Sequence, residues 1–166
     1  MFKIAICDDE KIFVELLHNI VLECVRETDV KCEINDFLSG RDLLKEIDDY
    51  DVIFIDIDMP DLDGIETGKI LNQRKSECKI IVASGRVDRF KESFYINARR
   101  FITKPFQKEE VKEALQLVLI EQKTLKKMKL YNNRISYDIL IKDICYAKAY
   151  NSYVEVAVLG KKEWKL

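Results

Sequence analysis

The sequence predicts an α/β fold in which a doubly wound parallel sheet of five strands carries helices on both faces. Short apolar segments alternate with amphipathic segments five times between residues 1 and 127. Strict alternation of strands and helices is typical of a parallel sheet. After residue 128 the pattern changes to short β-like segments, which predicts a small β-rich extension.

Each expected element follows from the local spacing of apolar residues. The five expected strands are Phe2–Cys7, Cys32–Phe37, Val52–Asp56, Lys79–Ala83 and Arg100–Thr103. The five expected helices are Lys11–Arg26, Arg41–Ile47, Ile65–Arg74, Asp88–Ile96 and Gln107–Lys127. In the first helix, one apolar stripe is expected to pack against the sheet, with Phe13, Leu17 and Val21 beside it; the stripe consists of Ile12, Leu16, Ile20 and Cys24.

Length and composition indicate one globular core with additional chain. The protein has 166 residues, of which 48% are hydrophobic and 35% charged. Its five cysteines form no CxxC pair, and the only histidine is His18, so neither a disulfide framework nor a zinc site is expected. No apolar segment approaches the roughly 20 residues that cross a bilayer. We expect a cytoplasmic protein that is neither exported nor bound to a membrane.

The extension divides the chain into expected domains at 1–127 and 128–166. Its expected strands are Lys129–Tyr131, Arg134–Ser136, Ile139–Ile141, Ile144–Ala149 and Tyr153–Leu159. Residues 1–121 carry 18 Lys/Arg and 26 Asp/Glu, a net charge of −8, whereas residues 122–166 carry 10 and 4, a net charge of +6. The basic part favours a polyanionic partner, although a solvated basic face would have the same composition.

Polar residues follow four of the expected strands where each strand ends. In parallel sheets, ligands bind beyond the carboxyl ends of the strands. We therefore expect the four polar segments to meet at one edge of the sheet. They are Asp8-Asp9-Glu10, Asp56-Ile57-Asp58, Ser84-Gly85 and Lys104-Pro105.

The residue types at this edge indicate phosphoryl transfer to an aspartate. Three or four carboxylates in one crevice repel one another unless they are protonated or bridged by a cation. Ligation by oxygen alone favours Mg²⁺, which also takes ligands from phosphates. A lysine supplies a positive charge for a phosphoryl group, and a serine hydroxyl can donate to its oxygens. Each feature is common alone, and their joint occurrence carries the interpretation.

These segments closely resemble the receiver family of response regulators over about 120 residues. The matching sequences are Cys7-Asp8-Asp9-Glu10, Val52 to Pro60 with Asp63-Gly64, Ala83-Ser84-Gly85 and Phe101 to Phe106. The resemblance implies a flavodoxin-like sheet with strand order 2-1-3-4-5. It also implies that a sensor histidine kinase is the phosphoryl donor, that homodimers can form on phosphorylation, and that catalysis is limited to the protein's own phosphorylation and dephosphorylation.

The resemblance also implies a role for each matching residue. Asp56 is the phosphoacceptor, and Asp9 and Asp56 are side-chain ligands of Mg²⁺. Asp8 supports the ion, and the Asp58 main-chain carbonyl is a further ligand. Ser84 and Lys104 contact the phosphoryl oxygens. Phe101 is the aromatic residue that turns inward when Ser84 moves, and the Lys104-Pro105 bond is expected to be cis.

Two charged residues are expected to flank the mouth of the site. Asp58 lies two residues after Asp56, and Arg86 lies two residues after Ser84. We predict that Arg86 pairs with Asp58 and thereby changes water access and the lifetime of the phosphorylated state. The alternative is two unpaired exposed charges.

The extension resembles the opening strands of a LytTR-type DNA-binding domain over about 35 residues. The matching segments are Lys142–Ala149 and Tyr153–Val156. This resemblance implies that a complete output domain binds DNA and controls transcription. Two other functions stay open at this point: an Mg²⁺-dependent phosphatase with an aspartate nucleophile, for which Asp58 would be the acid, and an interaction module that works without phosphorylation.

Overall fold

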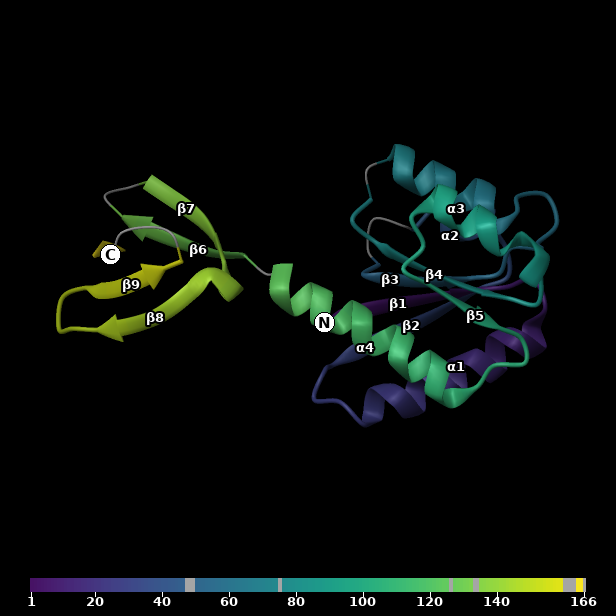
Figure 1. Ribbon diagram of the computed structural model, residues 1–166, viewed down its shortest axis with the longest axis horizontal. Helices are drawn as coiled ribbons and strands as arrows, with labels where there is room; N and C mark the ends of the chain where they lie inside the picture. Colours follow the sequence, from purple (N-terminus) through teal and green to yellow (C-terminus); the bar gives the residue numbers. More distant parts are fainter. Residues whose placement is uncertain (47–49, 75, 126, 133–134, 160–163, 166) are drawn as a thin grey trace. The chain divides into compact units, whose positions relative to one another are not determined.

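The computed structural model describes residues 1–46, 50–74, 76–125, 127–132, 135–159 and 164–165. The chain forms two compact units, Met1–Val118 and Leu119–Leu166. The division falls inside helix α4 (Lys108–Leu125), nine residues before the sequence-based division at residue 127. The two units are described separately, and Figure 1 traces the chain through both.

The first unit contains the predicted parallel sheet. Its strands are β1 (Phe2–Cys7), β2 (Cys32–Phe37), β3 (Val52–Ile55), β4 (Lys79–Ser84) and β5 (Arg100–Thr103). All four strand pairings are parallel and the order is β2-β1-β3-β4-β5, which confirms the expected topology. Strand β3 ends one residue earlier than predicted, so Asp56 lies in the loop, and β4 extends to include Ser84.

Helical segments cover both faces of this sheet. They are α1 (Lys11–Arg26), α2 (Gly40–Leu43), α3 (Gly64–Gln73), η2 (Val87–Ile96) and α4. Figure 1 shows α1 and α4 on one face and α2 and α3 on the other. The second helix is shorter than predicted, and its expected end at Ile47 lies outside the described residues. Segment η2 is a 3-10 helix, with three residues per turn, where an α-helix was expected.

The core of the first unit lies on both sides of a buried central strand. All four residues of β3 are buried, as expected for a strand with helices on both faces. Helices α3 and η2 approach closely at Gly68, where an added Cβ would lie 2.7 Å from the Ile96 side chain. All five cysteines are free thiols, and burial raises the pKa of Cys7 to about 12, so this thiol stays protonated at neutral pH.

The buried stripe of α1 differs from the predicted one. Val14, Leu17 and Val21 are buried, whereas Ile12 is 69% exposed and Leu16 is 42% exposed. The prediction that the stripe packs against the sheet was therefore wrong for Ile12 and Leu16, whereas Cys24 of the same stripe is buried. Apolar residues occupy two adjacent stripes of this helix, so a 3.6-residue period fits either stripe. The helix leaves the first of these stripes facing outward near its N-terminus.

The second unit consists of two antiparallel sheets. Strands β6 (Lys127–Asn132) and β7 (Ile135–Leu140) form a hairpin, and β8 (Ile144–Ala149), β9 (Val154–Val158) and β10 (Trp164–Lys165) form a sheet in the order β10-β9-β8. The expected strands Arg134–Ser136 and Ile139–Ile141 correspond to one strand, β7, although Arg134 itself lies outside the described residues. Ile141 is not part of this strand and begins the 3-10 helix η3 (Ile141–Asp143). Strand β10 was not predicted.

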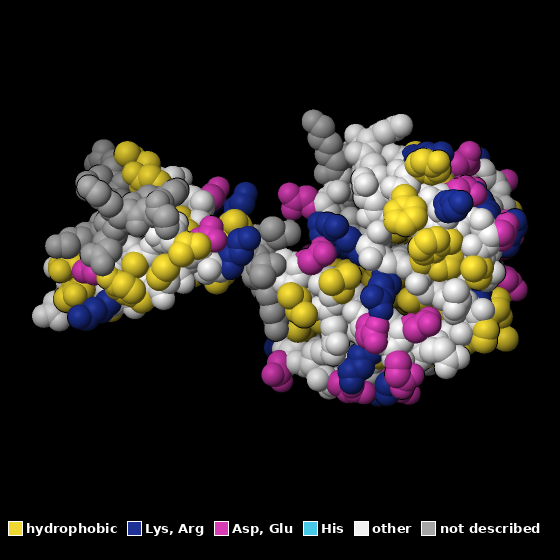
Figure 2. All heavy atoms as spheres, in the orientation of Figure 1, with side chains coloured by type: hydrophobic (Ala, Val, Ile, Leu, Met, Phe, Trp, Pro, Cys, Tyr) yellow, Lys and Arg dark blue, Asp and Glu magenta, His cyan; other side chains and the backbone are white. Residues whose placement is uncertain are grey.

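The core of the second unit is small. Its buried cluster consists of Ile139, Val156 and Val158 within the described residues. Seven apolar side chains line a hollow of about 540 Å³ in this unit: Met128, Leu130, Ile141, Ile144, Ala147, Val154 and Val156. Apolar side chains are also visible on the surface of each unit in Figure 2. None of the helices in the described part of the chain has the length and apolar character needed to cross a membrane.

Candidate functional site

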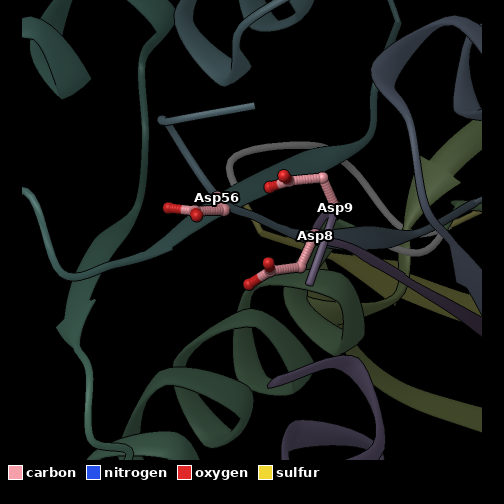
Figure 3. Close-up of side chains that lie close together, drawn as sticks. All are labelled: Asp8, Asp9 and Asp56. Carbon is pink, nitrogen blue, oxygen red and sulfur yellow. The ribbon is translucent and has the colours of Figure 1, made fainter. Parts of the chain in front are cut away.

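The expected acidic residues meet at the carboxyl edge of the parallel sheet. Asp8 and Asp9 follow β1, and Asp56 follows β3. Each of the three offers a carboxylate oxygen, and these oxygens lie within 4.8 Å of one another. Figure 3 shows the three carboxylate groups turned to the same side. Because β1 and β3 are adjacent parallel strands, their loops bring the acidic residues together as the sequence predicted.

Lys104 joins this cluster from the end of β5. Its Nζ donates to Asp8 Oδ2 at 2.7 Å and to Asp56 Oδ2 at 2.9 Å, and it lies 3.9 Å from the centre of the Phe13 ring. Burial works to lower the pKa of Lys104, but the hydrogen bonds to Asp8 and Asp56 outweigh burial and raise it. The lysine is therefore a fixed positive charge beside two buried carboxylates.

The buried Asp8 carboxylate has a higher pKa than a solvated one. Asp8 is 3% exposed, and burial raises its pKa, although the hydrogen bonds from Lys104 and the Glu10 amide work to lower it. The hydrogen bond from Lys104 thus does not offset the burial of the Asp8 carboxylate. A further cation at this position would favour the ionised form of Asp8.

The backbone fixes the position of the Asp56 carboxylate. The Asp56 amide donates to the Cys7 carbonyl at 2.9 Å, and the Ile57 amide donates to Asp56 Oδ1 at 2.7 Å. Gly64, the first residue of α3, packs against this loop, and an added Cβ on Gly64 would lie 2.0 Å from the Asp56 carbonyl oxygen. The loop between β3 and α3 therefore packs against Asp56 so closely that position 64 has no space for a side chain.

The donor atoms of the cluster suit a hard divalent cation. Among the residues that the structure describes, three carboxylates converge without a histidine or cysteine ligand, which matches the preference of Mg²⁺ for oxygen. Asp8 and Asp56 are buried, whereas Asp9 is more open to solvent. One open side is what an ion needs if it is to keep water ligands and take an oxygen from a phosphate.

Ser84 and Phe101 lie next to η2. Ser84 is fully buried at the end of β4, and its Oγ accepts a hydrogen bond from the Arg86 amide at 3.3 Å. The Phe101 ring, partly buried in β5, packs edge-on against the Phe90 ring with 5.3 Å between the ring centroids. Both residues therefore contact the start of η2. The Lys104-Pro105 bond is cis, as the resemblance implied.

The expected pair at the mouth of the site is present. Arg86 Nη1 donates to Asp58 Oδ2 at 3.1 Å. Arg86 also binds Asp88, through Nε at 3.0 Å and Nη2 at 2.9 Å, a partner that the sequence analysis missed. Asp88 lies only two residues further along the chain, in the first turn of η2, so proximity in sequence was the available signal. Arg86 is thus shared between two carboxylates.

Comparison with known proteins agrees with this geometry. Residues 4–116 match the family model described as the response regulator receiver domain. The chain belongs to the response regulator receiver family. The match to the receiver family ends within α4, so the second unit lies outside the matched residues.

Two groups of relatives differ in how much of their own length the chain covers. The chemotaxis protein CheY of Listeria monocytogenes is 30% identical over 120 residues, which is 70% of this chain and 97% of that protein. The transcriptional regulatory protein LytR of Staphylococcus aureus is 30% identical over 118 residues, which is 70% of this chain and 46% of LytR. The matched part thus spans about half the length of the LytR relatives.

Solved structures show the same fold. The response regulatory domain of mrkE from Klebsiella pneumoniae superposes with a TM-score of 0.64 at 26% identity, covering 72% of this chain and 97% of that one. The response regulator TrrA from Thermotoga maritima, solved in complex with Mg²⁺ and beryllium fluoride, gives a TM-score of 0.62 at 28% identity, covering 71% and 99%.

Proposed function

We propose that this receiver domain accepts a phosphoryl group on Asp56 from a sensor histidine kinase, with Mg²⁺, and switches conformation to control a LytTR-type output domain. The observation that carries the proposal is the cluster of Asp8, Asp9, Asp56 and Lys104 at the carboxyl edge of the sheet. A nucleophilic carboxylate, further acidic ligands and a fixed lysine are the groups that phosphoryl transfer to an aspartate needs.

The chain's own residues account for the transfer step. An Asp56 oxygen attacks the phosphorus, the bond between phosphorus and the donor atom breaks, and its electron pair leaves with the donor. The Ile57 amide and Lys104 hold the two Asp56 oxygens before the attack. Lys104 then donates a hydrogen bond to one phosphoryl oxygen, and the Ser84 hydroxyl donates to another. The product is an acyl phosphate on Asp56.

The same edge of the sheet would hold the metal ion. Asp9 and Asp56 would ligate Mg²⁺ through their side chains, Asp8 would support it, and the Asp58 main-chain carbonyl would complete the set. When bound, Mg²⁺ neutralises part of the negative charge on the transferring phosphoryl oxygens. The raised pKa of Asp8 supports this assignment, because a second cation would favour its ionised form.

The outward-facing stripe of α1 supports a protein donor. Ile12 and Leu16 are exposed on the helix that begins directly after the acidic loop Asp8-Asp9-Glu10. Apolar side chains that flank a catalytic edge suit contact with the apolar surface of another protein. A kinase helix packed on this stripe would bring its phosphohistidine to Asp56. Such an exchange takes place in the cytoplasm, the compartment that we propose for this protein.

The second unit supports an output role. It is β-rich, belongs to the part of the chain with a net charge of +6, and has an apolar hollow. LytR of Staphylococcus aureus, which the chain matches over 46% of its length, is named a transcriptional regulatory protein. DNA binding would belong to the complete output domain, and a basic segment alone would bind DNA weakly and without sequence specificity.

The arrangement of Asp58 favours a switch over a phosphatase. A phosphatase with an aspartate nucleophile would need the acid two residues later to protonate a leaving group. The Asp58 carboxylate instead accepts a hydrogen bond from Arg86 and is exposed. We propose that the protein catalyses only its own phosphorylation and dephosphorylation, with association into homodimers as one readout of the phosphorylated state.

Intact-mass spectrometry after incubation with acetyl phosphate and Mg²⁺ tests this function. The wild type should gain one acid-labile phosphoryl group, and Asp56→Asn should gain none. Removing Mg²⁺ with a chelator should abolish the adduct. Release of free phosphate from a generic phosphate monoester would favour the phosphatase, whereas no adduct on the wild type with Mg²⁺ bound would favour an interaction module that works without phosphorylation.

A further inference from the structure

An ion-pair cluster joins η2 to the first turn of α3. Arg89 Nη2 lies 2.8 Å from Asp63 Oδ2, and its Nε and Nη2 lie 2.8 Å and 2.7 Å from the Glu92 carboxylate. The Arg89 and Asp63 side chains are 19% and 26% exposed, compared with 45% for Arg86. A partly buried pair is screened less by salt than a fully exposed one, so salt should weaken the contact between Arg89 and Asp63 less than the contacts of Arg86.

Asp63 connects this pair to the phosphoacceptor loop. Its Oδ1 accepts a hydrogen bond from the Glu66 amide at 2.7 Å and caps α3, while its Oδ2 binds Arg89. The next residue, Gly64, packs against the Asp56 carbonyl and donates its amide to the Ile57 carbonyl at 3.0 Å. Asp63 and Gly64 therefore link Arg89 to the phosphoacceptor Asp56.

Segment η2 depends on such contacts because its own hydrogen bonding is weak. It is a 3-10 helix of ten residues, and runs of this geometry longer than about four residues are uncommon. At its start, the Arg86 amide binds Ser84, and further along, the Phe90 ring packs on Phe101. The first half of the segment thus contacts Phe101, follows directly after the contact with Ser84, and carries Arg89.

We propose that Arg89 is a positioning residue that couples phosphoryl capture on Asp56 to displacement of η2. This inference rests on the proposed function. The pair with Asp63 stabilises the observed arrangement, in which Lys104 holds the unmodified Asp56 carboxylate. When Ser84 turns toward a phosphoryl group, the Arg86 amide loses its partner, and Arg89 then sets how readily η2 leaves its position. Weakening the pair favours the displaced arrangement.

Linkage gives the direction of the effect. A ligand that selects the displaced arrangement binds more tightly to any variant in which the observed arrangement is less stable. Beryllium fluoride with Mg²⁺ is a suitable probe, since the similar response regulator TrrA was solved in complex with both. We expect Arg89→Ala to lower the apparent dissociation constant about fivefold, the scale of one partly buried ion pair.

The experiment compares the wild type with Arg89→Ala, Asp63→Asn and the double variant by fluorine nuclear magnetic resonance. Asparagine caps a helix as well as aspartate does, so Asp63→Asn removes the charge while it keeps the cap. If both residues act through one pair, the double variant should bind no more tightly than Arg89→Ala alone. Arg89→Lys should fall between wild type and Arg89→Ala, and amide exchange in η2 should be faster in Arg89→Ala than in Arg89→Lys.

The outcomes separate the two claims. A wild type that does not bind beryllium fluoride would overturn the proposed function itself. A wild type that binds, with equal or weaker binding in Arg89→Ala and in Arg89→Lys, would overturn the role of Arg89. Additive effects of the two substitutions would also overturn it. Lys112→Ala, which removes an ion pair with Glu27 between α1 and α4 on the other face of the sheet, should leave the affinity unchanged.

Discussion

Replacing Gly64 with alanine should displace the phosphoacceptor loop. Two effects oppose each other in this substitution. Alanine is favoured over glycine in a helix by up to about 1 kcal/mol. Against this, the new Cβ would lie 2.0 Å from the Asp56 carbonyl oxygen and 2.9 Å from its carbon, whereas favourable contacts begin near about 3.5 Å. The obstructing atoms belong to the backbone, so they cannot turn away.

The steric clash should therefore outweigh the helix propensity of alanine, so Gly64→Ala should lower the stability of the protein. Added groups in closely packed positions cost about 1–3 kcal/mol, and this contact is at the severe end, so a net loss of about 2 kcal/mol is expected. For a chain of this size, such a loss lowers the thermal midpoint by about 4–8 °C. Gly85→Ala is the comparison, because its Cβ would meet only Lys104 Cβ at 3.9 Å.

Thermal and urea unfolding followed by far-ultraviolet circular dichroism would measure both variants, since most described helical residues belong to the first unit. The Gly64→Ala variant should also incorporate phosphoryl groups more slowly, because relief of the contact moves Asp56 or α3. Unchanged or increased stability of Gly64→Ala would refute the reasoning, as would an equal loss in Gly85→Ala.

Three further predictions concern the charged residues around the site. Lys104→Met leaves two buried carboxylates without their cation. In the absence of Mg²⁺, the free energy of unfolding measured in urea should therefore fall by about 2–4 kcal/mol, and added Mg²⁺ should restore part of the loss. A variant as stable as the wild type would contradict this. Arg86→Ala should shorten the lifetime of the phosphorylated state by about two- to fivefold, the scale of one exposed ion pair, and equal hydrolysis rates in a decay assay would show that the pair has no such role. Burial works to raise the pKa of Asp63, but hydrogen bonds from the Glu66 amide and Arg89 outweigh it and lower the pKa. The ionised Asp63 therefore stabilises the protein above the unfolded pKa of about 4, and this contribution is lost as pH falls through the lower folded pKa. The stability difference between wild type and Asp63→Asn should shrink in urea titrations below about pH 4, and a constant difference would contradict this.

The sheet and its acidic edge could be predicted from sequence because both depend on simple periodic rules. Buried strands such as β3 are continuous apolar runs, and polar residues directly after such runs must lie at one edge of a parallel sheet. The pair of Arg86 and Asp58 followed from the same rule, since each residue lies two positions after a strand-end residue that faces the site.

Other features depend on packing that periodicity does not determine. The first helix has two apolar stripes, and only the shape of the sheet decides that Val14 and Leu17 are buried while Ile12 is exposed. The 3-10 geometry of η2 has the same apolar spacing over short stretches as an α-helix, so the sequence pattern could not distinguish them.

Other side-chain partners across loops, unlike Arg86 and Asp58, could not be predicted from the sequence. The contact of Arg89 with Asp63 joins residues 26 positions apart, and it depends on the rotamers of two long or capping side chains. In the second unit, alternating residues suggested two short strands where β7 is continuous, because the exposed face of a hairpin interrupts the apolar pattern without interrupting the strand.

Locating the phosphoryl group on the chain tests directly whether Asp56 is the phosphoacceptor. After incubation with acetyl phosphate and Mg²⁺, borohydride reduction converts an aspartyl phosphate to homoserine, and peptide mass mapping then identifies the modified residue. We expect homoserine at position 56 and nowhere else in the wild type, and none in Asp56→Asn. Modification at Asp8 or Asp9, or at any residue in the Asp56→Asn variant, would contradict the assignment of Asp56 as the phosphoacceptor.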